Sequence, residues 1–84
     1  MDVTRQVIAA LEGSLGIPGR LASADHQTPL LGAIPELDSM AVVAVLTALE
    51  ERFGLALDDD EIDGSTFANV GALVDLVERK LQAA

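Results

Sequence analysis

The chain has 84 residues, a formal net charge of −9 and no cysteine. This length suits one domain, which we expect to span residues 1–84, and it leaves little room for a deep catalytic cavity, so an enzyme is not expected. The negative charge disfavours nucleic-acid phosphates and anionic membrane surfaces and favours basic protein surfaces as partners. Without cysteine, disulfides, thiolate metal sites and a cysteine nucleophile are excluded, and any thiol must come from a prosthetic group.

Half of the residues are apolar, but aromatic residues make up only 2%. This composition favours an aliphatic helical core, because β-rich domains draw more on aromatic residues and Thr. Arg5, Glu12 and Arg20 interrupt the early apolar residues, so neither a signal peptide nor a membrane span is predicted. We therefore expect an all-α protein located in the cytoplasm.

The first predicted element is a helix from about Asp2 to Leu15, ended by Gly16 and Pro18. One face of this helix is apolar and consists of Val3, Val7, Ile8, Leu11 and Leu15. Residues 17–37 follow as a long connection rich in Pro and Gly. Large aliphatic residues interrupt it at intervals, which predicts an ordered crossover rather than a flexible linker. The residues expected to pin it to the core are Leu21, Leu30, Leu31, Ile34 and Leu37.

The second helix is predicted to begin at Asp38-Ser39 and to end near Phe53, before Gly54. Its expected buried stripe consists of Val42, Val45, Leu46, Leu49 and Phe53. The opposite side is unusually bland for a solvent-exposed surface and carries Ala41, Ala44, Ala48 and Glu51.

The acidic run at residues 58–63, anchored by Ile62, predicts a short third helix or turn, and Gly64 and Ser65 then break the chain. The last helix is predicted to open at the N-cap residue Asn69 and to continue to about Leu81. These elements predict a four-helix bundle with three main helices, a short third helix and a long first loop.

The motif that carries chemistry is Leu37-Asp38-Ser39-Met40, where the long loop ends and the second helix begins. The first turn of a helix has no preceding turn to cover it, so we expect the Ser39 hydroxyl to be exposed. A phosphodiester on Ser39 would lie at the positive end of the helix macrodipole. Asp38 is the candidate N-cap, and Met40 lies beside the attachment point. By themselves, however, Asp38 and Ser39 are more typical of a simple helix cap than of an attachment site.

This motif, together with the helix that follows it, resembles the acyl carrier protein family, in which the motif reads Asp-Ser-Leu or Asp-Ser-Met. The residues that carry the resemblance are Leu37-Asp38-Ser39-Met40, Leu46, Ala48-Leu49-Glu50-Glu51, Phe53-Gly54, Thr66-Phe67, Val70-Gly71 and Leu73-Val74. The first helix and the crossover match the family in pattern rather than in motif. The segment from Leu30 to Met40 is also similar to carriers associated with exosortase and exopolysaccharide gene clusters.

The resemblance implies that a phosphopantetheinyl transferase attaches 4′-phosphopantetheine covalently to Ser39, with Asp38 and Met40 as the neighbouring cofactor-binding residues. The thiol of the arm then carries acyl groups as thioesters. Acyl-loading and acyl-transfer enzymes of fatty acid, lipid, polyketide or related biosynthesis would be the partners, and the carrier itself catalyses nothing. We expect a monomer that meets these enzymes transiently, without stable membrane insertion.

Two other interpretations remain open from the sequence. A peptidyl or aminoacyl carrier would have the same residues, because the loading enzyme selects the cargo. An acidic helical interaction module without a prosthetic group would use Ser39 only as part of a cap. In addition, Ala41 and Ala44 stand where many carriers of bacterial fatty-acid synthesis have acids. This indicates either drift at a surface that tolerates Ala or partner binding through apolar contact.

No metal site is predicted. The acidic run matches the first ligand positions of a calcium-binding EF-hand loop, but Val70 falls where a bidentate Glu is required. His26 is the only histidine, and without Cys or a matched carboxylate spacing it makes no metal site. We expect His26 to lie on the surface of the loop.

Overall fold

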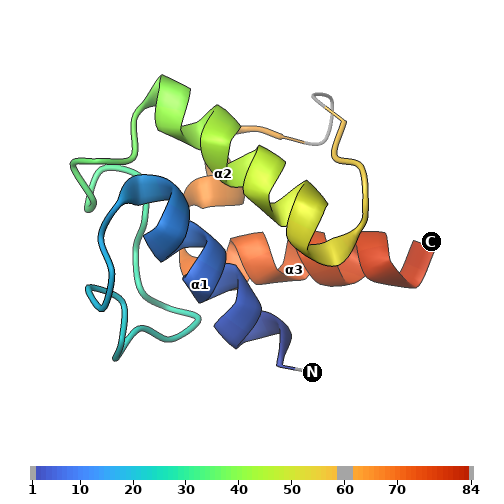
Figure 1. Cartoon of the computed structure of the whole chain (residues 1–84), viewed down its shortest axis with the longest axis horizontal. Coiled ribbons are helices and arrows are strands. Elements are labelled where there is room, and N and C mark those ends of the chain that lie inside the picture. The colour runs from blue at the N-terminus through green and yellow to red at the C-terminus, as the bar shows by residue number, and fades with distance from the viewer. Residues whose placement is uncertain (1, 59–61, 84) are drawn as a thin grey trace.

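Helices account for the regular secondary structure of the computed structural model, which describes residues 2–58 and 62–83 (Figure 1). In chain order the elements are α1 (Val3–Leu15), α2 (Ser39–Phe53), the short 3₁₀ helix η2 (Gly64–Phe67) and α3 (Val70–Ala83). Helix α1 packs against both α2 and α3, and η2 packs against α3. The all-α prediction is confirmed. Among the described helices, none combines the length and hydropathy needed to cross a membrane.

The ends of the first two helices follow from their capping residues. The carboxylate of Asp2 accepts a hydrogen bond from the Arg5 amide at 3.3 Å and starts α1. Gly16 and Gly54 end α1 and α2, each with a φ of 66° in the left-handed region. A residue with a Cβ atom rarely adopts this conformation, whereas Gly adopts it without steric cost. The predicted ends of both helices are therefore confirmed.

A short 3₁₀ helix, η2, forms directly after the acidic run. Residues 59–61 of the acidic run lie outside the described part of the chain, and the remainder of that run is not helical. Instead, the Asp63 carboxylate accepts hydrogen bonds from the Ser65 amide at 2.9 Å and the Thr66 amide at 3.3 Å, and the Thr66 hydroxyl accepts one from the Asp63 amide at 3.1 Å. This capping box starts η2 at the position where a break was expected.

Aliphatic side chains from the helices and the crossover form one core, as predicted from the composition. The largest fully buried side chains are Val7, Leu11, Leu30, Val45, Leu49, Val70, Leu73, Val74 and Val77. On α2, the core contact is wider than the predicted stripe, because Ala41 and Ala48 also pack against the core and are only half exposed.

Backbone hydrogen bonds fasten the crossover to the start of α3. Four N–H···O=C bonds of 2.8 to 3.2 Å join Val70 to Thr28, Gly71 to His26, Leu30 to Ala68, and Leu31 to Phe67. Two of these bonds satisfy the first N–H groups of α3, which have no intrahelical acceptor. The Asn69 side chain satisfies a third, accepting from the Ala72 amide at 2.8 Å, which confirms its predicted capping role. The prediction of an ordered crossover is confirmed.

The side chain of Leu31 does not pin the crossover to the core, contrary to the prediction, although its backbone amide donates to Phe67. Its side chain is 48% exposed, whereas that of Leu30 is fully buried. Leu31 lies in a turn that begins at Leu30, because the amides of Ala33 and Ile34 donate to the Leu30 carbonyl oxygen at 3.1 and 3.0 Å. Leu30 therefore points into the core and Leu31 points out of it.

Replacement of Gly by Ala is predicted to have opposite effects on the free energy of unfolding at Gly71, where the crossover contacts α3, and at Gly13 in α1. A Cβ atom at Gly71 would lie 2.8 Å from the carbonyl oxygen of His26, whereas one at Gly13 would have nothing within 4 Å. We expect Gly71→Ala to lower the free energy of unfolding by about 1–3 kcal/mol. Gly13→Ala should raise it by about 0.5–1 kcal/mol, because Ala restricts the unfolded chain. Urea unfolding followed by circular dichroism would measure both, and a stabilising Gly71→Ala would contradict the close packing.

Candidate functional site

Ser39 is the first residue of α2 and is exposed, as expected from its position in the sequence. The start of α2 lies at the edge of the molecule, where the green end of the crossover enters the helix (Figure 1). Leu37, which is 5% exposed, anchors the chain in the core two residues earlier. Within residues 2–58 and 62–83, the Ser39 hydroxyl has no hydrogen-bond partner. The hydroxyl is therefore free to react with a molecule that approaches from solvent.

The first turn of α2 is only partly capped. Asp38 accepts the Ala41 amide through its carboxylate at 2.8 Å and the Val42 amide through its carbonyl at 2.9 Å. No acceptor for the amides of Ser39 and Met40 is found in the described part of the chain. Unpaired N–H groups at a helix start carry a positive partial charge. These residues therefore fit an anionic phosphodiester on the side chain of Ser39.

A bidentate ion pair links the beginning of the crossover to the segment before α2. Arg20 Nη1 lies 2.7 Å from Glu36 Oε2, and Arg20 Nη2 lies 3.2 Å from Glu36 Oε1. The hydrogen bonds from Arg20 lower the pKa of the Glu36 carboxyl, and the same pairing raises the pKa of Arg20. The pair holds the two ends of the crossover together three residues before Ser39. Nothing in the sequence indicates this pairing, because the two residues are separated by a loop without a regular period.

The surface beside Ser39 is apolar or neutral. Met40 is 82% exposed and Val43 is 62% exposed, and residues three positions apart in a helix lie on the same side. Ala44 and Thr47 are also exposed and continue this surface along α2. We refer to Met40, Val43, Ala44 and Thr47 as the outer α2 face. The exposure of Met40 agrees with its predicted place next to the serine.

His26 has a structural role in the crossover. Its ring Nε2 lies 2.8 Å from the Thr4 hydroxyl of α1, and its carbonyl oxygen accepts the Gly71 amide at 2.8 Å. It is exposed, as expected. In the described part of the chain, no group of three or more acidic or histidine side chains is arranged to hold a metal ion. Asp59 and Glu61, two of the residues that resemble an EF-hand loop, lie outside the described residues, and Asp63 is occupied in capping η2.

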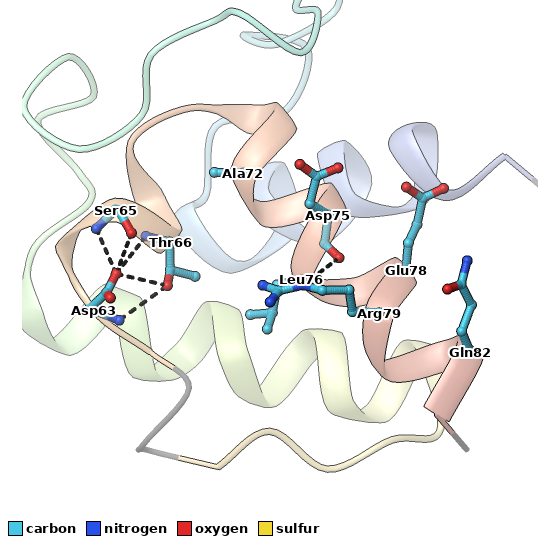
Figure 2. Close-up of a pocket in the computed structure, with 9 residues that line it drawn as sticks. All are labelled: Asp63, Ser65, Thr66, Ala72, Asp75, Leu76, Glu78, Arg79 and Gln82. Carbon is cyan, nitrogen blue, oxygen red and sulfur yellow. Dashed lines mark hydrogen bonds between the residues drawn. The ribbon is translucent and has the colours of Figure 1, made fainter.

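A groove of about 580 Å³ lies along α3 and η2 and contains none of the predicted site residues (Figure 2). Its lining consists of Asp63, Ser65, Thr66, Ala72, Asp75, Leu76, Glu78, Arg79 and Gln82. At one end, hydrogen bonds from the Ser65 hydroxyl and amide and from Thr66 lower the pKa of the Asp63 carboxyl. Further along, Arg79 Nε donates to the Asp75 carbonyl oxygen at 3.4 Å. The polar groups at the Asp63 end thus serve to cap η2.

Comparison with known proteins gives one family and one close structural relative. The family model described as "Phosphopantetheine attachment site" matches residues 5–77. The solution NMR structure of a holo acyl carrier protein from Nitrosomonas europaea is 46% identical in sequence and superimposes with a TM-score of 0.91. The match covers 98% of this chain and 99% of that one. A search of curated proteins found no significant match.

The capping geometry of Asp38 predicts how substitutions at this position affect stability. Asp38→Ala removes the acceptor for the Ala41 amide and should lower the free energy of unfolding by about 1 kcal/mol. Asp38→Asn keeps a side-chain oxygen at the same position, so its free energy of unfolding should fall by only a small part of that loss. Chemical denaturation of both variants would measure the difference. Equal losses for Ala and Asn would show that the carboxylate does not act as the cap.

The ion pair of Glu36 predicts a pH-dependent contribution to stability. A carboxyl whose pKa is lowered in the folded state stabilises the fold above its ordinary pKa, and the effect is lost as the pH falls through the lowered value. The thermal midpoint of Glu36→Gln should therefore lie below that of the wild type near neutral pH and approach it in acid. Thermal unfolding across the acidic range measures this gap. Glu51→Gln is the matched control, because no hydrogen bond or ion pair involves the Glu51 carboxylate among the described residues. If Glu51→Gln lowered the thermal midpoint near neutral pH as much as Glu36→Gln does, the stabilising role of the Arg20–Glu36 ion pair would be contradicted.

Proposed function

The chain belongs to the acyl carrier protein family, whose cofactor is covalently attached 4′-phosphopantetheine, and from this premise we propose that Ser39 carries that group. The protein is a carrier and not an enzyme. We further propose that residues 1–84 form a single carrier domain. The observation that supports the attachment site most directly is the exposed and unbonded hydroxyl of Ser39 at the start of α2.

The other serines of the chain fit this role less well. Ser14 is half-buried within α1, and Ser23 lies in the crossover away from any helix start. Ser65 is exposed near the start of η2, but its hydroxyl donates a hydrogen bond to the Asp63 carboxylate at 2.5 Å. Ser39 alone combines exposure, an unbonded hydroxyl and a position at the start of a full-length α-helix within the described residues.

The roles of the neighbouring residues follow from their contacts. A phosphopantetheinyl transferase would use coenzyme A and magnesium to form the phosphodiester at the Ser39 oxygen, which loses its proton as adenosine 3′,5′-bisphosphate leaves coenzyme A. Asp38 holds the first turn of α2 and so orients Ser39. Met40 and its apolar neighbours contact the enzyme. When bound, the group supplies a thiol that holds cargo as a thioester.

We propose acyl groups as the cargo and a cytoplasmic location. The identity of 46% to an acyl carrier protein over nearly the whole chain favours acyl over aminoacyl cargo. Acyl-loading and acyl-transfer enzymes of fatty acid, lipid or polyketide biosynthesis are then the partners. The charge of −9 opposes self-association and favours a monomer.

Incubation with coenzyme A, magnesium and a broad-specificity phosphopantetheinyl transferase tests the attachment site. Intact-mass spectrometry should show a gain of about 340 Da for the wild type, the mass of one phosphopantetheine ester. Ser39→Ala should show no gain, because no other hydroxyl occupies an equivalent position. Ser23→Ala and Ser65→Ala are matched controls and should gain the full mass. A gain in mass of the Ser39→Ala variant would show that the group is attached to another residue.

A further inference from the structure

Resting on the proposed attachment at Ser39, we propose that Arg20 and Glu36 are positioning residues for the modification of that serine. Their ion pair completes a path of polar contacts that runs from α1 through the crossover to the start of α2. By holding the segment before α2, this path fixes the Ser39 hydroxyl in the place from which it attacks coenzyme A. Both residues act through the backbone before Ser39 and not on the reacting atoms.

The first part of this path joins α1 to the segment that carries Arg20. Glu12, near the end of α1, accepts the Leu21 amide through Oε2 at 2.9 Å. The Arg20 amide donates to the Ile17 carbonyl oxygen at 3.1 Å, and the side chains of Ile17 and Leu21 are buried in the core. The backbone of Arg20 is therefore held on both sides, although its guanidinium is exposed.

The second part of the path joins Glu36 to the start of α2. The Arg20 guanidinium donates to both carboxylate oxygens of Glu36, at 2.7 and 3.2 Å. The Glu36 carbonyl oxygen accepts the Asp38 amide at 3.2 Å, and the Asp38 carboxylate accepts the Ala41 amide at 2.8 Å. Ser39 lies in the chain between Asp38 and Ala41. A displacement of Glu36 would therefore move the backbone that carries the Ser39 hydroxyl.

Among the described residues, the Arg20–Glu36 pair is the one hydrogen-bonded link between residues 17–24 and residues 32–38 of the crossover. The buried side chains of Ile34 and Leu37 also anchor the second of these segments, but apolar contact is not directional. Two parallel N–H···O bonds between a guanidinium and a carboxylate, in contrast, fix a relative orientation. The ion pair thus supplies an orientation that burial alone does not.

The transfer to Ser39 depends on this orientation. The Ser39 oxygen forms a bond to the phosphorus that carries the pantetheine, the bond from that phosphorus to adenosine 3′,5′-bisphosphate breaks, and the serine proton passes to a base of the transferase. Such a displacement is fast only when the attacking oxygen is held close to the phosphorus and in line with the leaving group. Because the side chains are 49% and 37% exposed, solvent weakens the pair, and its loss should slow the reaction only a few-fold.

Single-turnover kinetics of the transferase with coenzyme A and the full chain separate the step at Ser39 from binding and product release. Arg20→Gln and Glu36→Gln should each lower the maximal rate about three- to fivefold, while the concentration for half-saturation changes less than about twofold. The combination of both substitutions should cost no more than either alone, because each already breaks the pair. Circular dichroism at the assay temperature verifies that every variant is folded.

Arg52→Gln is the matched control for the loss of an exposed arginine. Arg52 lies in the last turn of α2, at the opposite end from Ser39, and its Nη1 donates to Gln6 Oε1 of α1 at 2.7 Å. The substitution removes the same charge and a link of similar length between two elements. The maximal rate of Arg52→Gln should stay within about 1.5-fold of the wild-type rate, since this link is far from the attachment site.

Exchange of the two charges distinguishes positioning from a direct contact with the transferase. Arg20→Glu alone places two carboxylates together and should slow the modification more than Arg20→Gln does. Arg20→Glu combined with Glu36→Arg restores an ion pair and should recover at least about half of the wild-type rate. Amide hydrogen exchange gives a reading without the enzyme: the Asp38 and Ala41 amides should exchange about three- to fivefold faster in Arg20→Gln and at the wild-type rate in Arg52→Gln.

Each contrary outcome identifies what has failed. If the wild-type chain gains no mass, the proposed function fails, and this inference fails with it. If the wild type is modified and Arg20→Gln reacts at the same maximal rate, only this inference is overturned. It is also overturned if Arg20→Gln raises the half-saturating concentration at an unchanged maximal rate and the charge exchange recovers nothing, because the pair would then contact the transferase directly.

Discussion

The backbone hydrogen bonds between the crossover and the start of α3 are the constraint on which the site depends. They hold residues 26–31 against the end of η2 and the first turn of α3, so the long first connection behaves as a fixed part of the fold. Buried Leu30, Ile34 and Leu37 then carry the chain across the core to α2. Because Leu37 is anchored, α2 begins at a defined place, and Ser39 is held there without itself contributing to the core.

The starts of α2 and α3 are finished in opposite ways. At α3, the crossover carbonyls and the Asn69 side chain accept the first amides, so this end is closed by the protein itself. At α2, Asp38 accepts the amides of residues 41 and 42, while those of Ser39 and Met40 remain unpaired among the described residues. The closed end stabilises the fold, and the open end leaves room for an anionic group. The helix macrodipole makes the starts of both α2 and α3 positive, but only the start of α2 is available to a reactant.

Most acidic side chains in the described part of the chain take part in hydrogen bonds or ion pairs within the fold. Asp2, Asp38 and Asp63 cap helices, and Glu12 and Glu50 accept backbone amides of the segments that follow them. Each of these carboxylates is fixed by its own protein and is less available to a partner. A high negative charge therefore does not by itself make every surface of a carrier an electrostatic docking site. Around Ser39 the surface offered to a partner is mostly apolar.

The sequence alone determined the features that depend on a few neighbouring residues. The α-helices, the capping roles of Asp38, Asn69, Gly16 and Gly54, and the exposure of Ser39 all follow from local hydrogen bonding and helical period. Tertiary structure decided the outward orientation of Leu31, the pairing of Arg20 with Glu36 and the close approach of Gly71 to His26. It also decided that Thr66 and Phe67 of η2 are buried against α3. These features join segments that are far apart in the chain. The spacing of neighbouring residues in the sequence does not indicate which distant residue each of them will contact.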